Sequence, residues 1–284
     1  MMKVAVIGLG LIGGSMAKAV HENANLEVYG TDADPKVIKM ALDEGTLSKE
    51  LKFDNVSDCD LVIVALYPKD VVSVIKSYSE YMKAGTIVVD CTGVKSPVCN
   101  ELSQSLLSKG IHFVGGHPMA GKEVAGYVNA ESVMFANASM ILCRDEYTDE
   151  TAFKQMCEFF LKIGFKRIKE TTPKEHDAVI AYTSQMAHII SNAYIKSDTL
   201  PNRYGFSAGS FKDLTRVAYL NEYMWTDLFL ENKESLLKEI DTFMEHMSEY
   251  REALSAENKE ELIKLLGRGR ELKEEDNNKE IQMG

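Results

Sequence analysis

Three glycines near the start of the chain have the spacing of a dinucleotide-binding turn. Gly8, Gly10 and Gly13 follow an apolar run at residues 4–7 and precede a helical pattern that begins near residue 16. In such a strand–turn–helix unit the first glycine permits the turn, the second lets a pyrophosphate approach the backbone, and the third lets the helix pack on the strand. The free N–H groups that open the helix point at the phosphates. The sequence therefore predicts a dinucleotide site formed by Gly8, Leu9, Gly10, Leu11, Ile12 and Gly13.

The second predicted strand, at residues 27–32, ends on an acidic residue, Asp32. Asp32 lies 22 residues past Gly10. A carboxylate at this point can accept hydrogen bonds from both ribose hydroxyls of NAD, and it repels the 2′-phosphate of NADP. The predicted cofactor is therefore NAD. A glycine turn that serves only the packing of helix on strand is the alternative interpretation.

His117 stands between the apolar run at residues 111–116 and Pro118, in a predicted loop bounded by glycines. An imidazole beside a nicotinamide is the usual acceptor for the proton of a hydroxyl that becomes a carbonyl as hydride leaves. A loop histidine that only hydrogen-bonds to the backbone is the alternative. His176 and His188 are 12 residues apart on a predicted helix, about 120° apart around its axis. With no cysteine cluster or H-E-x-x-H beside them, no metal site is expected.

Two cations, Lys212 and Arg216, are one helical turn apart, with Asp213 between them in the sequence. Like charges at this spacing repel slightly, so the pair suits either a solvated face or a bound dianion. An arginine can grip a carboxylate with two parallel hydrogen bonds. Ser184 and His188 also share a helical face.

Strands that alternate with helices must position these residues. Apolar runs of strand length occur at residues 4–7, 27–32, 61–66, 86–90, 111–116 and 139–143, and helical patterns separate most of them. This order predicts an α/β fold with a doubly wound, mostly parallel sheet of the Rossmann type. Ligands of such sheets bind at the carboxyl ends of the strands. The segments expected there are residues 8–13, Asp32, then Ala65, Leu66, Tyr67 and Pro68, then Thr92 and Gly93, and finally residues 117–123.

The pattern changes near residue 148, after which helical periodicity dominates. Helices are expected at 151–163, 174–196, 211–218, 222–254 and 256–266, and a short strand at 165–169 would extend the sheet. We therefore expect a dinucleotide-binding domain at 1–147, an all-helical domain at 148–266 and a charged tail at 267–284, which we expect to be a solvated terminus.

The composition excludes some partners. The 284 residues carry a net charge of −11, which does not favour nucleic acid or an anionic membrane surface. An anionic substrate would need locally placed cations for the same reason. Five cysteines without C-x-x-C spacing indicate reduced thiols in a cytosolic protein. No signal peptide and no apolar run of membrane-spanning length is found in the sequence.

Taken together, these motifs resemble those of the prephenate dehydrogenase family, whose enzymes act in tyrosine biosynthesis. The glycine turn at 8–15, Asp32, H-P-M-A-G at 117–121, F-K-D-L-T-R at 211–216 and the block at 224–233 all fit, in order, over roughly residues 1–266. The blocks H-P-M-A-G and F-K-D-L-T-R are far more specific than the glycine turn, because other Rossmann-type dehydrogenases lack them.

The resemblance implies an NAD-dependent oxidative decarboxylation of prephenate to 4-hydroxyphenylpyruvate. His117 would accept the proton of the ring hydroxyl, and Arg216 would hold a substrate carboxylate with help from Lys212. Ser184, His188 and Trp225 would line the pocket, and Glu123, Asp213 and Arg216 would form an ionic gate. The family forms homodimers through the helical domain.

Two positions depart from the family pattern. Gly93 stands where better-known members carry a serine that helps to align histidine and cofactor; Thr92, Ser96 or a water molecule could supply a hydroxyl instead. Lys122 stands where a small hydroxyl residue is often found, and its charge could grip the second carboxylate of the substrate.

Three other functions stay open from the sequence. Arogenate shares the ring of prephenate, so an arogenate dehydrogenase or a cyclohexadienyl dehydrogenase of dual specificity would show the same motifs. A β-hydroxyacid dehydrogenase would need a catalytic lysine on the helix at 174–196, which carries lysines only near its ends. A non-catalytic NAD-binding sensor is the last alternative.

Overall fold

The computed structural model of the chain describes residues 2–122, 124–206 and 208–283. It divides into two compact units, Met1–Asn232 and Lys233–Gly284, which we describe separately. The first unit holds the sheet and every residue of the candidate site that the structure describes.

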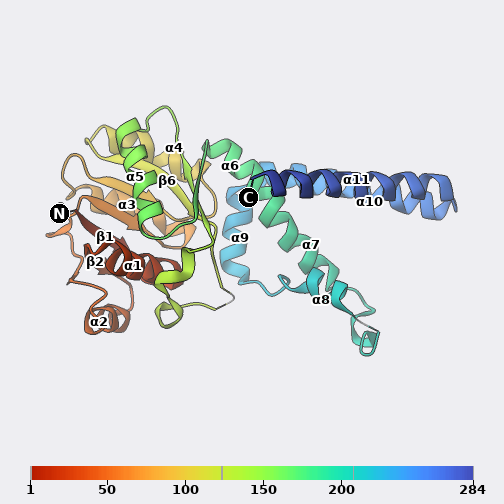
Figure 1. Cartoon of the computed structure of the whole chain (residues 1–284), viewed down its shortest axis with the longest axis horizontal. Helices are drawn as coiled ribbons and strands as arrows, with labels where there is room; N and C mark the ends of the chain where they lie inside the picture. Colours follow the sequence, from red (N-terminus) through yellow and green to blue (C-terminus); the bar gives the residue numbers. More distant parts are fainter. Residues whose placement is uncertain (1, 123, 207, 284) are drawn as a thin grey trace. The chain divides into compact units, whose positions relative to one another are not determined.

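An eight-stranded sheet forms the centre of the first unit, with strand order β3-β2-β1-β4-β5-β6-β7-β8 (Figure 1). Neighbouring strands are parallel except for β6 and β7, which run antiparallel. The predicted doubly wound, mostly parallel sheet is therefore confirmed. The strands are β1 (Lys3–Ile7), β2 (Glu27–Thr31), β3 (Lys49–Glu50), β4 (Leu61–Val64), β5 (Ile87–Asp90), β6 (His112–Pro118), β7 (Ser139–Cys143) and β8 (Arg167–Thr171).

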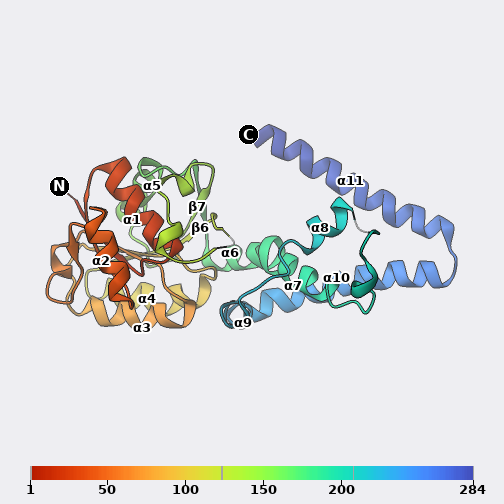
Figure 2. The ribbon, with the colours of Figure 1, turned by 90° about the horizontal axis from the view of Figure 1, so that it is seen from below.

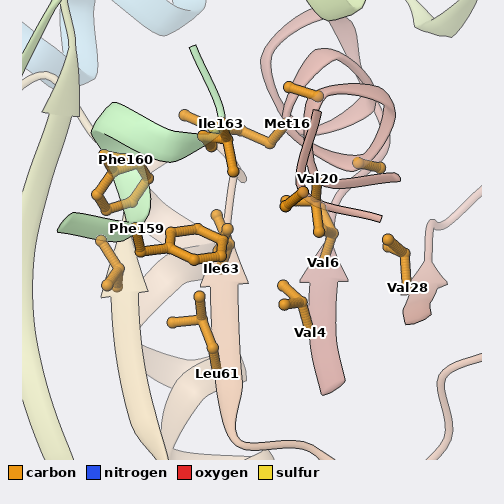
Figure 3. Close-up of a cluster of buried hydrophobic side chains, with 14 of the residues drawn as sticks. Val4, Val6, Met16, Val20, Val28, Leu61, Ile63, Phe159, Phe160 and Ile163 are labelled. Carbon is orange, nitrogen blue, oxygen red and sulfur yellow. The ribbon is translucent and has the colours of Figure 1, made fainter. Parts of the chain in front are cut away.

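Helices cover both faces of this sheet (Figure 2). Helices α1 (Leu11–Ala24) and α5 (Glu150–Lys162) pack on one face, and α3 (Pro68–Ser79) and α4 (Ser96–Leu107) pack on the other. Alternate residues of each central strand point to opposite faces, so each face has its own apolar core. Figure 3 shows the first core, in which Val4, Val6 and Ile63 of the strands meet Met16 of α1 and Phe160 of α5.

The helix after β2 begins with a side-chain cap and a proline. Helix α2 (Pro35–Asp43) has Pro35 at its first position, and the Asp34 side chain accepts a hydrogen bond from the backbone N–H of Lys36 at 2.9 Å. This is the usual arrangement of an N-cap carboxylate followed by proline. The ending of β2 beside Asp32 is thereby fixed, which positions the acidic residue of the predicted cofactor site.

Strand β6 is longer than predicted and contains His117. The sequence places His117 in a loop after the strand, but the strand continues to Pro118 because β7 pairs with it. His117 lies opposite Ile141, and Pro118 lies opposite Met140. The candidate base is therefore held by a strand ladder, which restricts its backbone more than a loop would.

The helix predicted at 174–196 is nearly continuous but changes its winding. It consists of α6 (Pro173–Ile180), a π-helical stretch (Ala181–Met186) and α7 (Ala187–Tyr194). Two further helices complete the first unit, α8 (Gly209–Thr215) and α9 (Glu222–Glu231). Short 3₁₀ turns lie at Val56–Asp58, Tyr127–Asn129, Ser132–Phe135 and Leu200–Asn202.

The second unit is a pair of contacting helices, α10 (Lys233–Ser255) and α11 (Lys259–Met283). The helix predicted at 222–254 is thus interrupted at Asn232. The charged tail predicted as a solvated terminus is helical in the part that the structure describes, because α11 continues through it. Its residues from 268 to 279 are all exposed. No helix among the described residues is long and apolar enough to cross a membrane.

Candidate active site

The glycine turn has the close contacts that its spacing predicts. Gly8 has a φ of +87°, and a Cβ there would lie 2.4 Å from the carbonyl oxygen of Ala65. A Cβ on Gly13 would lie 1.8 Å from the carbonyl oxygen of Gly8, so α1 can approach β1 only with glycine at this position. A Cβ on Gly10 would meet no atom within 4 Å. Gly10 therefore leaves open space at the N-terminus of a 14-residue helix, as a bound pyrophosphate requires.

Asp32 lies beside this turn at the end of β2. Its carboxylate accepts a hydrogen bond from the backbone N–H of Leu9 at 2.7 Å and another from Asp34 at 2.9 Å. The acidic group is thus fixed next to the turn, where the family of dinucleotide folds binds the adenosine ribose. The residues of the turn and Asp32 together fit NAD.

The next strand ends also lie in the predicted order. The backbone N–H of Ala65 donates to Ile7 at 2.8 Å, which places the segment of Ala65 and Leu66 beside the glycine turn. Tyr67 is the exposed N-cap of α3, and Pro68 is its first residue. Thr92 is buried after β5 and donates to the carbonyl oxygen of Val94 at 3.0 Å, so its hydroxyl serves the loop.

His117 belongs to a chain of three hydrogen-bonded side chains. Its Nδ1 lies 2.9 Å from Nε2 of His176, and Nδ1 of His176 lies 2.8 Å from the carboxylate of Asp177. Asp177 also accepts hydrogen bonds from the backbone N–H groups of Lys95, at 2.7 Å, and Ser96, at 2.8 Å. Asp177 thereby joins the start of α6 to the start of α4.

This chain determines which nitrogen of His117 is basic. The carboxylate of Asp177 is an acceptor only, so Nδ1 of His176 carries a proton and Nε2 of the neutral ring accepts. Nδ1 of His117 must then carry a proton, which leaves Nε2 of His117 unprotonated. Among the described residues none hydrogen-bonds to that Nε2. It lies 3.9 Å from the position of a Cβ built on Gly93, at the end of the neighbouring strand.

The electrostatics of the three groups agree with these protonation states. Burial, the adjacent His176 and the Lys95 ammonium hold the pKa of His117 well below its ordinary value. Burial also lowers the pKa of His176, against the opposing effect of Asp177. Burial alone would raise the pKa of Asp177, but hydrogen bonds from His176, Ser96 and Lys95 outweigh it and lower that pKa. At neutral pH both histidines are therefore neutral and Asp177 is ionised.

A buried ion pair supports the backbone on either side of His117. The fully buried Lys95 ammonium donates to Asp90, to the hydroxyl of Thr92 at 2.9 Å and to the carbonyl oxygen of Gly116 at 2.6 Å. Asp90 also accepts from the backbone N–H of Gly116 at 3.2 Å. Since a buried charge is tolerated only when paired and hydrogen-bonded, this arrangement fixes the end of β6 firmly against β5.

Some of the predicted substrate residues are brought together on the helical side. The rings of His188 and Trp225 have centroids 4.0 Å apart, and Nδ1 of His188 lies 3.1 Å from the carbonyl oxygen of Val217. Arg216 precedes Val217, and its charge contributes, after burial, to lowering the pKa of His188. Ser184 lies partly buried in the π-helical stretch one turn before His188.

Other predicted residues lie on the surface or outside the described part. Lys212 and Asp213 are exposed on α8, and Arg216 is exposed at its C-cap. Lys122 pairs with Glu131 at 2.7 Å, so its charge has a protein partner. Glu123, predicted as part of the ionic gate, lies outside the described residues. In the part of the chain that the structure describes, no group of three or more His, Cys, Asp or Glu side chains could hold a metal ion, and all five cysteines are free.

The roles of His176, Asp177, Lys95 and Asp90 could not be predicted from the sequence. His176 is 59 positions from His117, so no local pattern connects them. Two features of the sequence could have indicated these residues: an adjacent His–Asp pair at the start of a helix, and a lysine five residues after an aspartate that ends a strand. Neither is specific, because such charged and polar residues are mostly exposed.

A glycine turn, an acidic residue after the second strand and a histidine near the carboxyl end of the sixth strand of a doubly wound sheet are typical of Rossmann-type dehydrogenases. Comparison with known families is more specific. The model of the prephenate dehydrogenase nucleotide-binding domain matches residues 16–169, and the model of the prephenate dehydrogenase dimerization domain matches residues 172–268. The chain belongs to the prephenate dehydrogenase family, as its motifs predict.

Similar proteins extend over nearly the whole chain. A cyclohexadienyl dehydrogenase of Zymomonas mobilis is 31% identical over 92% of this chain and 91% of its own length. A prephenate dehydrogenase of Aquifex aeolicus, solved with hydroxyphenyl propionate and NAD+, is 28% identical with a TM-score of 0.85, over 97% of this chain and 98% of that one. A Synechocystis arogenate dehydrogenase is 25% identical with a TM-score of 0.85, over 96% of this chain and 99% of that one.

Proposed function

We propose that this chain catalyses the NAD-dependent oxidative decarboxylation of prephenate to 4-hydroxyphenylpyruvate, a step of tyrosine biosynthesis. The observation that carries the proposal is the hydrogen-bonded chain from Asp177 through His176 to His117, because it leaves Nε2 of His117 as a free base at the strand ends. Gly93 also lies at these strand ends, and a Cβ built on it would be 3.9 Å from Nε2 of His117.

The cofactor site needs only residues that are already positioned. The turn at residues 8–13 and Asp32 would bind the pyrophosphate and the adenosine ribose, and the segments 65–68 and 92–93 would flank the nicotinamide. Bound NAD supplies the hydride acceptor of the reaction. The carboxyl group of Asp32 would select against the 2′-phosphate of NADP.

His117 acts on the ring hydroxyl of the substrate. Its neutral Nε2 accepts the hydroxyl proton as the carbon that bears this hydroxyl is oxidised. The bond between the ring and its carboxylate then breaks and CO₂ departs. The electron pair of the broken bond aromatises the ring, and His117 returns the proton to the phenolic oxygen. No net proton is released. Aromatisation makes the reaction favourable, so positioning and electrostatics suffice for catalysis.

Cations on the helical side would bind the anionic substrate. Arg216 would hold a carboxylate, and Lys212, one turn earlier on the exposed face of α8, would assist it. His188 and Trp225, whose rings are in contact, would line the pocket with Ser184. Glu123, Asp213 and Arg216 would form the gate. Lys122 would reach the second carboxylate by exchanging its partner Glu131 for the ligand.

The active form would be a cytoplasmic homodimer joined through the helical domain. Large apolar side chains of α10 and α11 are exposed in the single chain, which a partner subunit would cover. They include Leu237, Met244, Met247, Leu254, Ile263 and Leu266. The matched dimerization domain supports this assembly.

Absorbance at 340 nm tests the proposal. Purified enzyme with NAD and prephenate should produce NADH and 4-hydroxyphenylpyruvate, and NADP should be a poor replacement for NAD. Arogenate is the second candidate substrate, because an arogenate dehydrogenase shares the fold over almost the whole chain. A higher kcat/KM with arogenate would replace prephenate in the assignment, and no NADH with either substrate would contradict it.

A further inference from the structure

Glu231, the last residue of α9, carries a carboxyl oxygen that no protein group satisfies. Its Oε2 is buried and has no hydrogen-bond partner among the described residues. The helix end around it is well ordered by hydrogen bonds, since the Asn232 side chain donates to the carbonyl oxygen of Asp177 and to Gln185, each at 2.8 Å. A buried acceptor left unsatisfied in an otherwise satisfied region is unfavourable, so it indicates a missing donor.

None of the residues that the structure describes donates a hydrogen bond to this oxygen. Lys95 is the nearby cation, but its ammonium has three protons and donates to Asp90, Thr92 and Gly116. The other charged groups that influence Glu231 are the carboxylates of Asp227, Asp177 and Asp90. A bound ligand with an N–H or O–H group would satisfy this oxygen, and the surrounding negative charge favours a donor that is neutral or positively charged.

The helix that carries Glu231 borders the predicted nicotinamide position. Leu228, one turn earlier on α9, has its Cδ2 3.3 Å from a Cβ built on Gly93. The backbone carbonyl of Leu228 accepts a hydrogen bond from Gln185 at 3.1 Å, which holds this face of α9 in place. Leu228 and Glu231 are three residues apart and lie on one side of the helix, so both face the loop after β5.

We propose that Glu231 accepts a hydrogen bond from the carboxamide N–H₂ of the nicotinamide end of the bound cofactor. This inference rests on the proposed function, which places the nicotinamide beside Gly93. The ring substrate is a dianion whose hydroxyl goes to His117, so its carboxylates would be repelled by Glu231. The carboxamide supplies a neutral donor, and the oxidised ring adds a positive charge that a carboxylate stabilises.

The ionisation of Glu231 fits this role. Burial and the carboxylate of Asp227, with smaller contributions from Asp177 and Asp90, raise its pKa to about 7 against the opposing effect of Lys95. A group with this pKa changes its charge readily in response to a bound cation. Binding of the positively charged nicotinamide would draw Glu231 into its ionised form.

A binding cycle with three ligands tests the proposal without the ring substrate, so its outcome is independent of the proposed activity. Dissociation constants are measured by calorimetry at pH 8 for NAD, for 3-acetylpyridine adenine dinucleotide, which lacks the amide N–H₂, and for ADP-ribose, which lacks the nicotinamide. The proteins are the wild type, Glu231→Met, Glu231→Gln, and the exposed control Glu222→Gln at the start of α9.

The wild type and the control should bind NAD roughly ten- to hundredfold more tightly than the acetylpyridine analogue, as for a hydrogen bond to a charged acceptor. Glu231→Met should lose most of that ratio and keep its affinity for ADP-ribose. Glu231→Gln, which keeps an acceptor oxygen without the charge, should give an intermediate ratio. An unchanged ratio in Glu231→Met overturns the proposal.

If Glu231→Met fails to fold, the Glu231→Gln variant tests the proposal instead. A wild-type ratio between its dissociation constants for the acetylpyridine analogue and for NAD would overturn the proposal. The α-ammonium of arogenate is the other N–H donor that a carboxyl here could take. A Glu231→Gln enzyme with an altered preference between arogenate and prephenate, but the wild-type ratio between NAD and its analogue, would place Glu231 at the substrate and contradict the proposal.

Discussion

Nδ1 of His117 lies 2.9 Å from Nε2 of His176, so one histidine fixes the protonation of the other. His176 in turn is fixed by Asp177, which lies 2.8 Å from its second nitrogen. This order leaves the basic Nε2 of His117 on the side of Gly93, where it lies 3.9 Å from a Cβ built on that glycine.

Asp177→Asn should invert the order of donors and acceptors. An asparagine amide can donate to Nδ1 of His176, which would put the proton of that ring on Nε2 and turn it toward Nδ1 of His117. We expect kcat to fall roughly 10²- to 10⁴-fold, the range for the loss of a general base, because His117 would then be held in the wrong tautomer. Steady-state rates at 340 nm with prephenate measure it.

The exposed residue Asp198 supplies the matched control for that variant. Asp198→Asn should keep the wild-type kcat, and both variants should keep the wild-type affinity for NAD. A normal kcat in Asp177→Asn would show that the tautomer of His117 is set by something else.

The acidic fall of kcat/KM should occur at a lower pH than it would for a histidine with an ordinary pKa. Burial, His176 and Lys95 lower the pKa of His117, so its neutral, basic form persists below the ordinary value of 6.5. With NAD saturating, kcat/KM for prephenate should therefore stay level from about pH 8 to 6.5 and fall only at lower pH. A limb centred at or above 6.5 would mean that His117 is not the base or is not shielded as described.

Arg216→Ala should weaken substrate binding more than turnover. Loss of a guanidinium that grips a carboxylate removes charge-assisted hydrogen bonds, so KM for prephenate should rise about ten- to hundredfold, with little change in the dissociation constant of NAD. Arg167→Ala, on the exposed edge strand β8, is the control and should leave KM unchanged. The assignment of Arg216 fails if both variants have the same KM.

Much of the fold could be predicted because its signals are local. The continuous apolar run at residues 61–66 is typical of a strand buried on both faces, and β4 (Leu61–Val64) is such a strand. Asp34 followed by Pro35 is typical of a helix start, and α2 begins there. The extension of β6 through His117 could not be predicted, because it depends on antiparallel pairing with β7, which is distant in sequence. The helical tail was also missed, since a charged segment with glycines at 267 and 269 lacks the apolar stripe that indicates a helix.

The site was predictable only where a residue type has one dominant use. The glycine turn and Asp32 belong to such a pattern, and their contacts in the structure match it. Lys95 was not predictable, since a lysine in a loop is usually exposed and here it is fully buried. The pairing of His117 with His176 arises only when the start of α6 is joined to the loop after β5.

The central claim, that His117 is the base acting on the ring hydroxyl beside NAD, is tested most directly by His117→Asn. Asparagine keeps a polar side chain of similar reach but cannot accept the proton. The variant should bind NAD with wild-type affinity in calorimetry, and its kcat with prephenate should fall roughly 10²- to 10⁴-fold. Turnover equal to that of the wild type would contradict the account.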